Sequence, residues 1–254
     1  MNYTAITVFG IGFIFLMTTL GAALVYCFKT QMPEKLQSAL FGFAAGVMTA
    51  ASVWSLLLPA LSEAETAWGS LAFVPVTIGF LLGGALIVGF DRALSFRKNE
   101  ECGRAKKLFL SVTLHNIPEG LAVGFAFGAA QSVGTAAAYI AALGLAVGVG
   151  VQNLPEGAAV SLPMQTALQS KHKAFLYGAW SAVVEPIFAV IGYFFAAYLQ
   201  VLQPWLLAFS AGAMIFVVSE ELLPETKRDI KSSIGAWGVM LGFALMMILD
   251  VALG

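Results

Sequence analysis

HNIPEG, at residues 115–120, and QNLPEG, at residues 152–157, are closely similar polar segments, and each lies inside a long apolar run. A third carboxylate, Glu185, lies in another such run. Placing an ionisable residue at bilayer depth costs roughly 3 kcal/mol, so such residues usually face an ion path or a polar partner. The chain therefore carries side chains of metal-binding type into what is predicted to be a membrane.

The composition supports a membrane protein, because 59% of the 254 residues are hydrophobic and only 11% are charged. A helical span needs about 20 apolar residues. Eight runs meet this length, at 4–28, 37–61, 71–90, 108–130, 134–161, 174–198, 204–223 and 234–253. They predict an all-α membrane protein with a single eight-helix transmembrane domain over residues 1–254. The net charge of −1 gives no sign of a nucleic-acid partner, and the expected surroundings are the lipid bilayer.

The basic residues predict the orientation of the chain. All thirteen fall in the loops after spans 1, 3, 5 and 7: Lys29, Lys35, Arg92, Arg97, Lys98, Arg104, Lys106, Lys107, Lys171, Lys173, Lys227, Arg228 and Lys231. Because cytoplasmic loops are enriched in Lys and Arg, loops 1–2, 3–4, 5–6 and 7–8 are expected in the cytoplasm and both termini outside. We expect a multi-pass protein of the cell (inner) membrane, with a cytoplasmic loop over 91–107.

A short internal sequence similarity relates span 2 to span 7. The first contains Phe43-Ala44-Ala45-Gly46-Val47-Met48, and the second contains FSAGAM at 209–214. An inverted repeat of helices 1–3 and 6–8 around central helices 4 and 5 would produce this similarity. The alternative is that small-residue helix interfaces often resemble one another.

The two polar segments place their ligand-type residues at helical spacing. His115 and Glu119 are four residues apart, as are Gln152 and Glu156, so each pair lies on one face of its helix. A proline between the two positions removes a backbone donor. The glycine that closes each segment allows another helix to approach closely.

Three carboxylates without a basic partner would repel one another, and no predicted span contains Lys or Arg. They must be protonated, hydrated or bound to cations. The combination of His, Gln, Asn and Glu suits divalent zinc, iron and manganese. The alternative is that these buried polar residues only join helices by hydrogen bonds.

These motifs resemble the ZIP family of divalent-metal transporters, in particular its bacterial GufA-like branch. The resemblance extends to FAAGVM at 43–48, VVSEELLPE at 217–225 and GFALMMILD at 242–250. It implies transport of zinc, and of cadmium, iron or manganese, into the cytoplasm through a binuclear site between spans 2, 4, 5 and 6. The metals are cargo and no cofactor is expected. The resemblance also implies a homodimer.

Carried over by position, the resemblance assigns eight metal ligands. The first metal would be held by Met48, His115, Glu119, Asn153 and Glu156, and the second by Asn116, Glu119, Gln152, Glu156 and Glu185. Glu119 and Glu156 would bridge the two ions. Many members of the family have His where Gln152 stands. Glu220 and Glu221, near the cytoplasmic end of span 7, are either an exit-side relay or interfacial carboxylates.

Two other classes of function compete with transport. An intramembrane zinc metallohydrolase could also use His and Glu, but the common zinc proteases need His-Glu-x-x-His. The chain has only His115 and His172, and neither stands in that motif, so no catalytic residue is assigned. A metal-sensing or scaffold protein would bind metal without moving it across a membrane.

Overall fold

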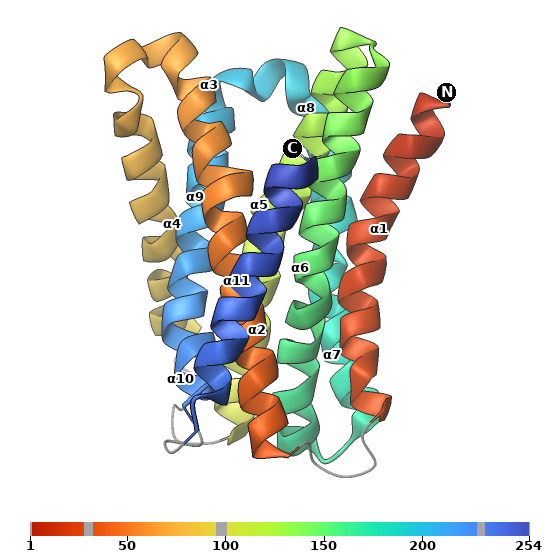
Figure 1. The fold of residues 1–254 in the computed structure, drawn as a ribbon, viewed down its shortest axis with the longest axis vertical. Coiled ribbons are helices and arrows are strands. Elements are labelled where there is room, and N and C mark those ends of the chain that lie inside the picture. Colours follow the sequence, from red (N-terminus) through yellow and green to blue (C-terminus); the bar gives the residue numbers. More distant parts are fainter. Residues whose placement is uncertain (1, 28–32, 95–100, 228–231, 254) are drawn as a thin grey trace.

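The computed structural model describes residues 2–27, 33–94, 101–227 and 232–253, and within these ranges the regular structure is entirely helical. The longer helices are α1 (Tyr3–Ala23), α2 (Glu34–Ala51), α3 (Leu58–Trp68), α4 (Phe73–Leu94), α5 (Glu101–Val133), α6 (Ala136–Leu168), α7 (Lys171–Ala182), α8 (Val184–Leu199), α9 (Gln203–Val217) and α11 (Ile234–Leu253). The short α10 (Leu223–Glu225) follows α9. The helices form an elongated bundle, and the N- and C-termini lie towards the same end of it (Figure 1).

Seven helical segments among the described residues are long and apolar enough to cross a membrane. They are Tyr3–Cys27, Glu34–Leu71, Phe73–Phe90, Ala136–Leu168, Lys171–Ala196, Gln203–Glu225 and Ile234–Ala252. They correspond to seven of the eight predicted spans. The bundle also exposes large apolar side chains, such as Val8, Phe194 and Met240, each more than 60% exposed. An apolar outer surface of this kind suits contact with lipid.

The predicted span 108–130 lies within α5, which is not among those seven segments. The middle of α5 carries His115, Asn116 and Glu119. These polar side chains lower the mean hydropathy of the helix. The residues that suggest a functional site therefore also weaken the membrane signal of the helix that carries them.

The prediction of a loop over 91–107 was largely wrong. Helix α4 continues to Leu94 and α5 begins at Glu101, so only residues 95–100 lie between them, outside the described part of the chain. Arg, Lys, Glu and Ala favour helix, and Ala105 is buried against the bundle. The charges over 101–107 therefore extend the helix beyond its apolar part instead of ending it.

Two of the predicted spans contain a π-helical turn. Ser52–Leu57 joins α2 to α3, and Val218–Leu222 joins α9 to α10. The backbone N–H of Leu58 bonds to the carbonyl of Val53 in the first, and that of Leu223 to Val218 in the second, which is the i→i−5 pattern. Such turns are rare and are frequent at functional sites.

Glycines bring four pairs of helices into backbone contact. A Cβ atom at Gly157 of α6 would collide with the carbonyl oxygen of Thr18 on α1, and one at Gly120 of α5 would collide with the backbone of Glu185 on α8. Similar approaches join α2 to α11 and α4 to α9. The prediction that the two motif glycines allow close helix approach is confirmed. These contacts hold α1 and α8 directly against the two helices that carry the polar motifs.

Candidate metal site

The polar motifs come together in the interior of the bundle. Helix α5 supplies His115, Asn116 and Glu119, α6 supplies Gln152, Asn153 and Glu156, and α8 supplies Glu185. Each of these seven residues is at most 1% exposed. Burying so many polar groups is unfavourable unless they are paired or bind a cation.

His115, Glu119 and Glu156 form the centre of the site. One ligand atom from each residue lies within 4.8 Å of the ligand atoms of the other two. The predicted i, i+4 spacing puts His115 and Glu119 on one face of α5, and α6 brings Glu156 against that face. One nitrogen and two carboxylate oxygens are a suitable ligand set for zinc and related divalent ions.

The His115 ring is oriented by its own helix. Its Nδ1 lies 3.2 Å from the carbonyl oxygen of Ser111, which can only accept, so Nδ1 donates. In the neutral ring this leaves the lone pair on Nε2, which lies 2.6 Å from Oε1 of Glu156 without hydrogen-bond geometry. Metal-binding histidines commonly use one ring nitrogen for such an anchoring bond and the other for the metal.

Glu185 lies in the first turn of α8, where the helix dipole favours a carboxylate. The chain turns at Val183 between α7 and α8, and Pro186 is accommodated because its missing N–H falls in the first turn of a helix. The Glu185 Oε1 atom accepts hydrogen bonds from Thr18 Oγ1 at 2.6 Å and from Asn116 Nδ2 at 3.2 Å. The Asn116 amide also donates to the Ser181 carbonyl at 3.1 Å.

The two amides of α6 face different carboxylates. Gln152 Nε2 donates to Glu119 Oε1 at 2.5 Å. The Asn153 side chain lies next to Glu185, although without a hydrogen bond of good geometry. Gln152 therefore accompanies the His115 cluster, and Asn153 accompanies Glu185.

Many acceptor atoms in this site have no hydrogen-bond partner. They are His115 Nε2, Asn116 Oδ1, Glu119 Oε2, Gln152 Oε1, Asn153 Oδ1, Glu156 Oε1, Glu156 Oε2 and Glu185 Oε2. Leaving one buried polar atom unpaired costs about 1–3 kcal/mol, and more for a charged group. A convergent set of unpaired nitrogen and oxygen acceptors is the environment that a divalent cation requires.

Met48, the predicted ligand from span 2, is fully buried near the end of α2. It belongs to an apolar cluster that includes Val112 of α5, Ala159 of α6 and Met214 of α9. Its backbone carbonyl accepts a hydrogen bond from Ser52 at 2.7 Å. Its assignment as a metal ligand stays a prediction.

The residue that the sequence did not single out is Thr18 on α1. It is fully buried and donates to Glu185. Hydroxyl residues are ordinary in apolar helices, where most bond to their own backbone, so the sequence gives little signal of such a role.

The two glutamates near the end of α9 have different surroundings. Glu221 forms an ion pair with Lys107 of α5 at 2.6 Å, whereas Glu220 is exposed. Both lie in or beside the second π-helical turn. The pair joins α5 to the span that ends in α10, at the end of the bundle opposite the termini.

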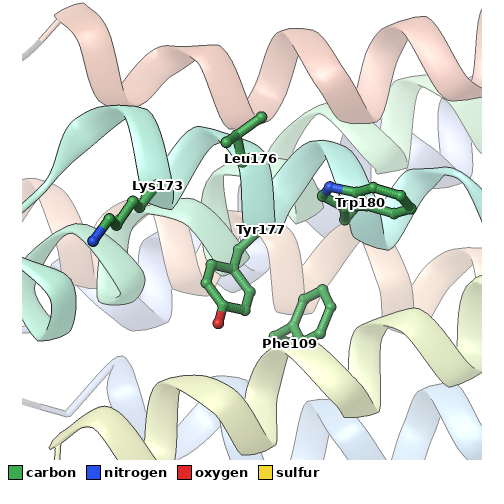
Figure 2. A pocket seen from close by; sticks show the side chains of 5 residues that line it. All are labelled: Phe109, Lys173, Leu176, Tyr177 and Trp180. Atoms are coloured by element: carbon green, nitrogen blue, oxygen red, sulfur yellow. The ribbon is translucent and has the colours of Figure 1, made fainter.

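A groove of about 270 Å³ lies away from the predicted ligands, between α5 and α7. Phe109, Lys173, Leu176, Tyr177 and Trp180 line it (Figure 2). The rings of Phe109 and Tyr177 are in edge-to-face contact, with centroids 5.1 Å apart. None of the predicted metal ligands takes part in this groove.

Apolar helices of membrane-spanning length, packed around a buried set of cation-seeking side chains, define a class of multi-pass membrane proteins that handle metal ions. Within that class, a family profile described as "ZIP Zinc transporter" matches residues 101–250, and the chain belongs to the ZIP zinc transporter family. This membership confirms the resemblance in the motifs and places the chain among transporters, not among metallohydrolases.

Curated relatives match the chain along nearly its whole length. It is 35% identical to Zinc transporter ZIP11 of Xenopus tropicalis, over 94% of each chain. It is 34% identical to Zinc transporter ZIPB of Bordetella bronchiseptica, over 94% of this chain and 79% of that protein. It is 33% identical to Zinc transporter GufA of Myxococcus xanthus, over 93% of this chain and 94% of that protein.

Proposed function

We propose that this protein transports divalent transition-metal cations, with zinc as the main substrate, across the cell (inner) membrane into the cytoplasm. The observation that carries the proposal is the buried cluster of His115, Glu119 and Glu156, whose unpaired acceptor atoms converge inside a bundle of apolar helices. Cadmium, iron and manganese share enough of this ligand chemistry to be secondary substrates.

The site is best described as binuclear. In this proposal His115 and Gln152 define one half, Asn116, Asn153 and Glu185 define the other, and Glu119 and Glu156 would be shared by the two ions. This grouping places Gln152 with His115 and Asn153 with Glu185. The assignment carried over from the resemblance places Asn153 with His115 and Gln152 with Glu185. The contacts of Gln152 with Glu119, and of Asn153 with Glu185, support the present grouping.

Helix α5 is proposed as the eighth span of a single domain. Seven candidate spans would place the two termini on opposite sides of a membrane, whereas they lie towards the same end of the bundle (Figure 1). One more crossing is therefore needed. The predicted span 108–130 in α5 supplies it, and the basic residues then put both termini outside.

An inverted repeat is supported by two features. Ser52 and Val218, where the π-helical turns begin, stand the same nine residues after Phe43 and Phe209. The main contacts between helices also correspond in pairs under this repeat. The contact of α2 with α11 corresponds to that of α9 with α4, and the contact of α1 with α6 corresponds to that of α8 with α5. Spans 1–3 would then correspond to spans 6–8. The homodimer implied by the resemblance stays a prediction.

Metal uptake by liposomes that contain only this protein tests the function. We expect saturable zinc entry and weaker entry of cadmium, manganese and iron. Metal binding without entry would favour a sensor or scaffold. Hydrolysis of a peptide without metal entry would favour the metallohydrolase.

Replacing Gln152 by histidine is expected to tighten zinc binding. Gln152 Oε1 is buried without a partner beside Glu119, and an imidazole nitrogen there is a better zinc ligand than an amide oxygen. We expect a lower apparent KM for zinc, an equal or lower maximal rate, and a zinc-to-manganese preference raised roughly tenfold, or about 1.4 kcal/mol. Competition between the two metals measures this ratio. Gln169→His, an exposed position at the end of the same helix, should leave it unchanged.

Thiol labelling of intact cells tests the orientation. The chain has two cysteines, and Cys27 is exposed at the end of α1 that is predicted to be cytoplasmic. In a Cys102→Ser background, Cys27 should react with a permeant reagent but not with an impermeant one. A cysteine introduced at the exposed Asn2, which precedes the first predicted span, should react with both reagents in a background without Cys27. The reverse pattern would overturn the orientation.

A further inference from the structure

Thr18 differs from three other threonines of the long helices in the partner of its hydroxyl group. Thr7, Thr49 and Thr113 each donate to the carbonyl of the residue four positions earlier. This is the usual way in which a hydroxyl is satisfied inside a helix. Thr18 also lies 3.2 Å from such a carbonyl, that of Ile14, but its hydroxyl is only 2.6 Å from Glu185 Oε1. A hydroxyl has one proton to donate, and the shorter distance is typical of a bond to a carboxylate.

The packing of the bundle fixes Thr18 in this place. Gly157 of the second polar motif approaches the Thr18 backbone, as Gly120 of the first motif approaches the Glu185 backbone. Thr18 on α1 thus packs against the glycine of the second motif in the same way as Glu185 on α8 packs against the glycine of the first. Gly21 meets the Leu154 carbonyl one turn further along α1. Helix α1 cannot rotate or withdraw without breaking these backbone contacts.

The hydrogen bonds divide the two oxygens of Glu185 between the protein and the cation. Oε1 is held by the Thr18 hydroxyl and the Asn116 amide, whereas Oε2 is buried and has no partner. A carboxylate held in this way presents one oxygen in a fixed direction. Outer groups that orient ligands in this manner are part of many metal sites.

We propose that Thr18 is a positioning residue for the transported metal: its hydroxyl holds Oε1 of Glu185 so that Oε2 is offered to the cation as a single-oxygen ligand. The inference rests on the proposed function and deepens it by adding helix α1 to the metal site. Thr18 itself does not touch the metal.

Zinc binding and uptake by the Thr18→Val and Thr18→Ser variants test this role. Valine keeps the shape and removes the hydroxyl, and serine keeps the hydroxyl. We expect Thr18→Val to weaken zinc binding and raise the apparent KM about 10–100-fold, with a smaller effect on the maximal rate per folded molecule. Thr18→Ser should restore both values. The matched control is Thr7→Val in the same helix, which loses only a bond to its own backbone and should behave as the wild type.

A double-mutant cycle with Glu185→Gln separates positioning from a general structural role. If Thr18 acts through Glu185, adding Thr18→Val to Glu185→Gln should cause little further loss of zinc affinity. Unchanged binding and KM in Thr18→Val, or fully additive losses in the double variant, would overturn the inference. Should Thr18→Val not fold, the comparison of Thr18→Ala with Thr18→Ser isolates the hydroxyl in a smaller side chain.

The same assays distinguish this failure from a failure of the proposed function. Absence of zinc entry with the wild-type protein would refute the transport function. Normal zinc entry that depends on Glu185 but not on Thr18 would refute only the positioning role.

Discussion

Replacing Glu119 by alanine is expected to abolish zinc uptake while the protein still folds and inserts. Glu119 lies in the cluster with His115 and Glu156 and accepts a hydrogen bond from Gln152, and in the proposed site it is a ligand shared by the two ions. The substitution removes a buried carboxyl group and with it a ligand oxygen. Since even outer-shell changes cost metal sites 10–100-fold, we expect the initial rate of uptake to fall by at least about 100-fold.

The matched control is Glu65→Ala, which removes a carboxylate from an exposed position on α3. It should transport zinc at close to the wild-type rate. Protein amount and monodispersity must be equal in all samples, so that rate and yield are not confused. Near-normal uptake by Glu119→Ala would mean that the shared-ligand assignment is incorrect.

Replacing Gly157 by alanine is expected to produce a large loss of stability. The new Cβ would collide with the carbonyl carbon and oxygen of Thr18 and with the backbone nitrogen of Ala22, and backbone atoms cannot move aside as a flexible side chain can. Helices α1 and α6 would have to separate. Overpacking of this kind typically costs about 1–3 kcal/mol, and a rigid backbone contact should lie at the upper end. Thermal unfolding in detergent measures the change.

Gly12→Ala provides the comparison for this prediction. Gly12 lies on the exposed face of α1 with open space around its Cα, so a methyl group meets nothing. Because alanine favours helix over glycine by up to about 1 kcal/mol, this variant should be as stable as the wild type or more stable. If the two substitutions had equal effects, close packing of α1 on α6 would not limit stability.

Much of the fold follows from two regular patterns in the sequence. Apolar runs of spanning length predicted seven segments that the structure forms, and the repeated i, i+4 spacing predicted which faces of α5 and α6 meet. Charge was less reliable as a guide to helix ends. The polar residues 101–107 were assigned to a loop, but they extend α5, because helix formation depends on propensity and on neighbours as well as on hydropathy.

The sequence could not assign the two amides of α6. Gln152 and Asn153 are adjacent, so their side chains point about 100° apart around the helix. Which of them faces Glu119 depends on how α6 is rotated against α5 and α1, and that rotation is set by glycine contacts between distant segments. The role of Thr18 was hidden for the same reason, since its partner is far away in the chain.

The two π-helical turns affect how the two halves of spans 2 and 7 pack. A π-helical turn contains one residue more than an α-helical turn. The extra residue rotates the side-chain directions of the following helix by about 100° about the helix axis. The half of each span before the turn, with Met48 or Met214, therefore packs on one set of neighbours. The turns themselves carry Ser55, which donates to Asp250, and Glu221, which pairs with Lys107. Each span thus consists of two short helices whose side-chain directions are rotated relative to each other. The sequence of one half can therefore change without altering the packing of the other half.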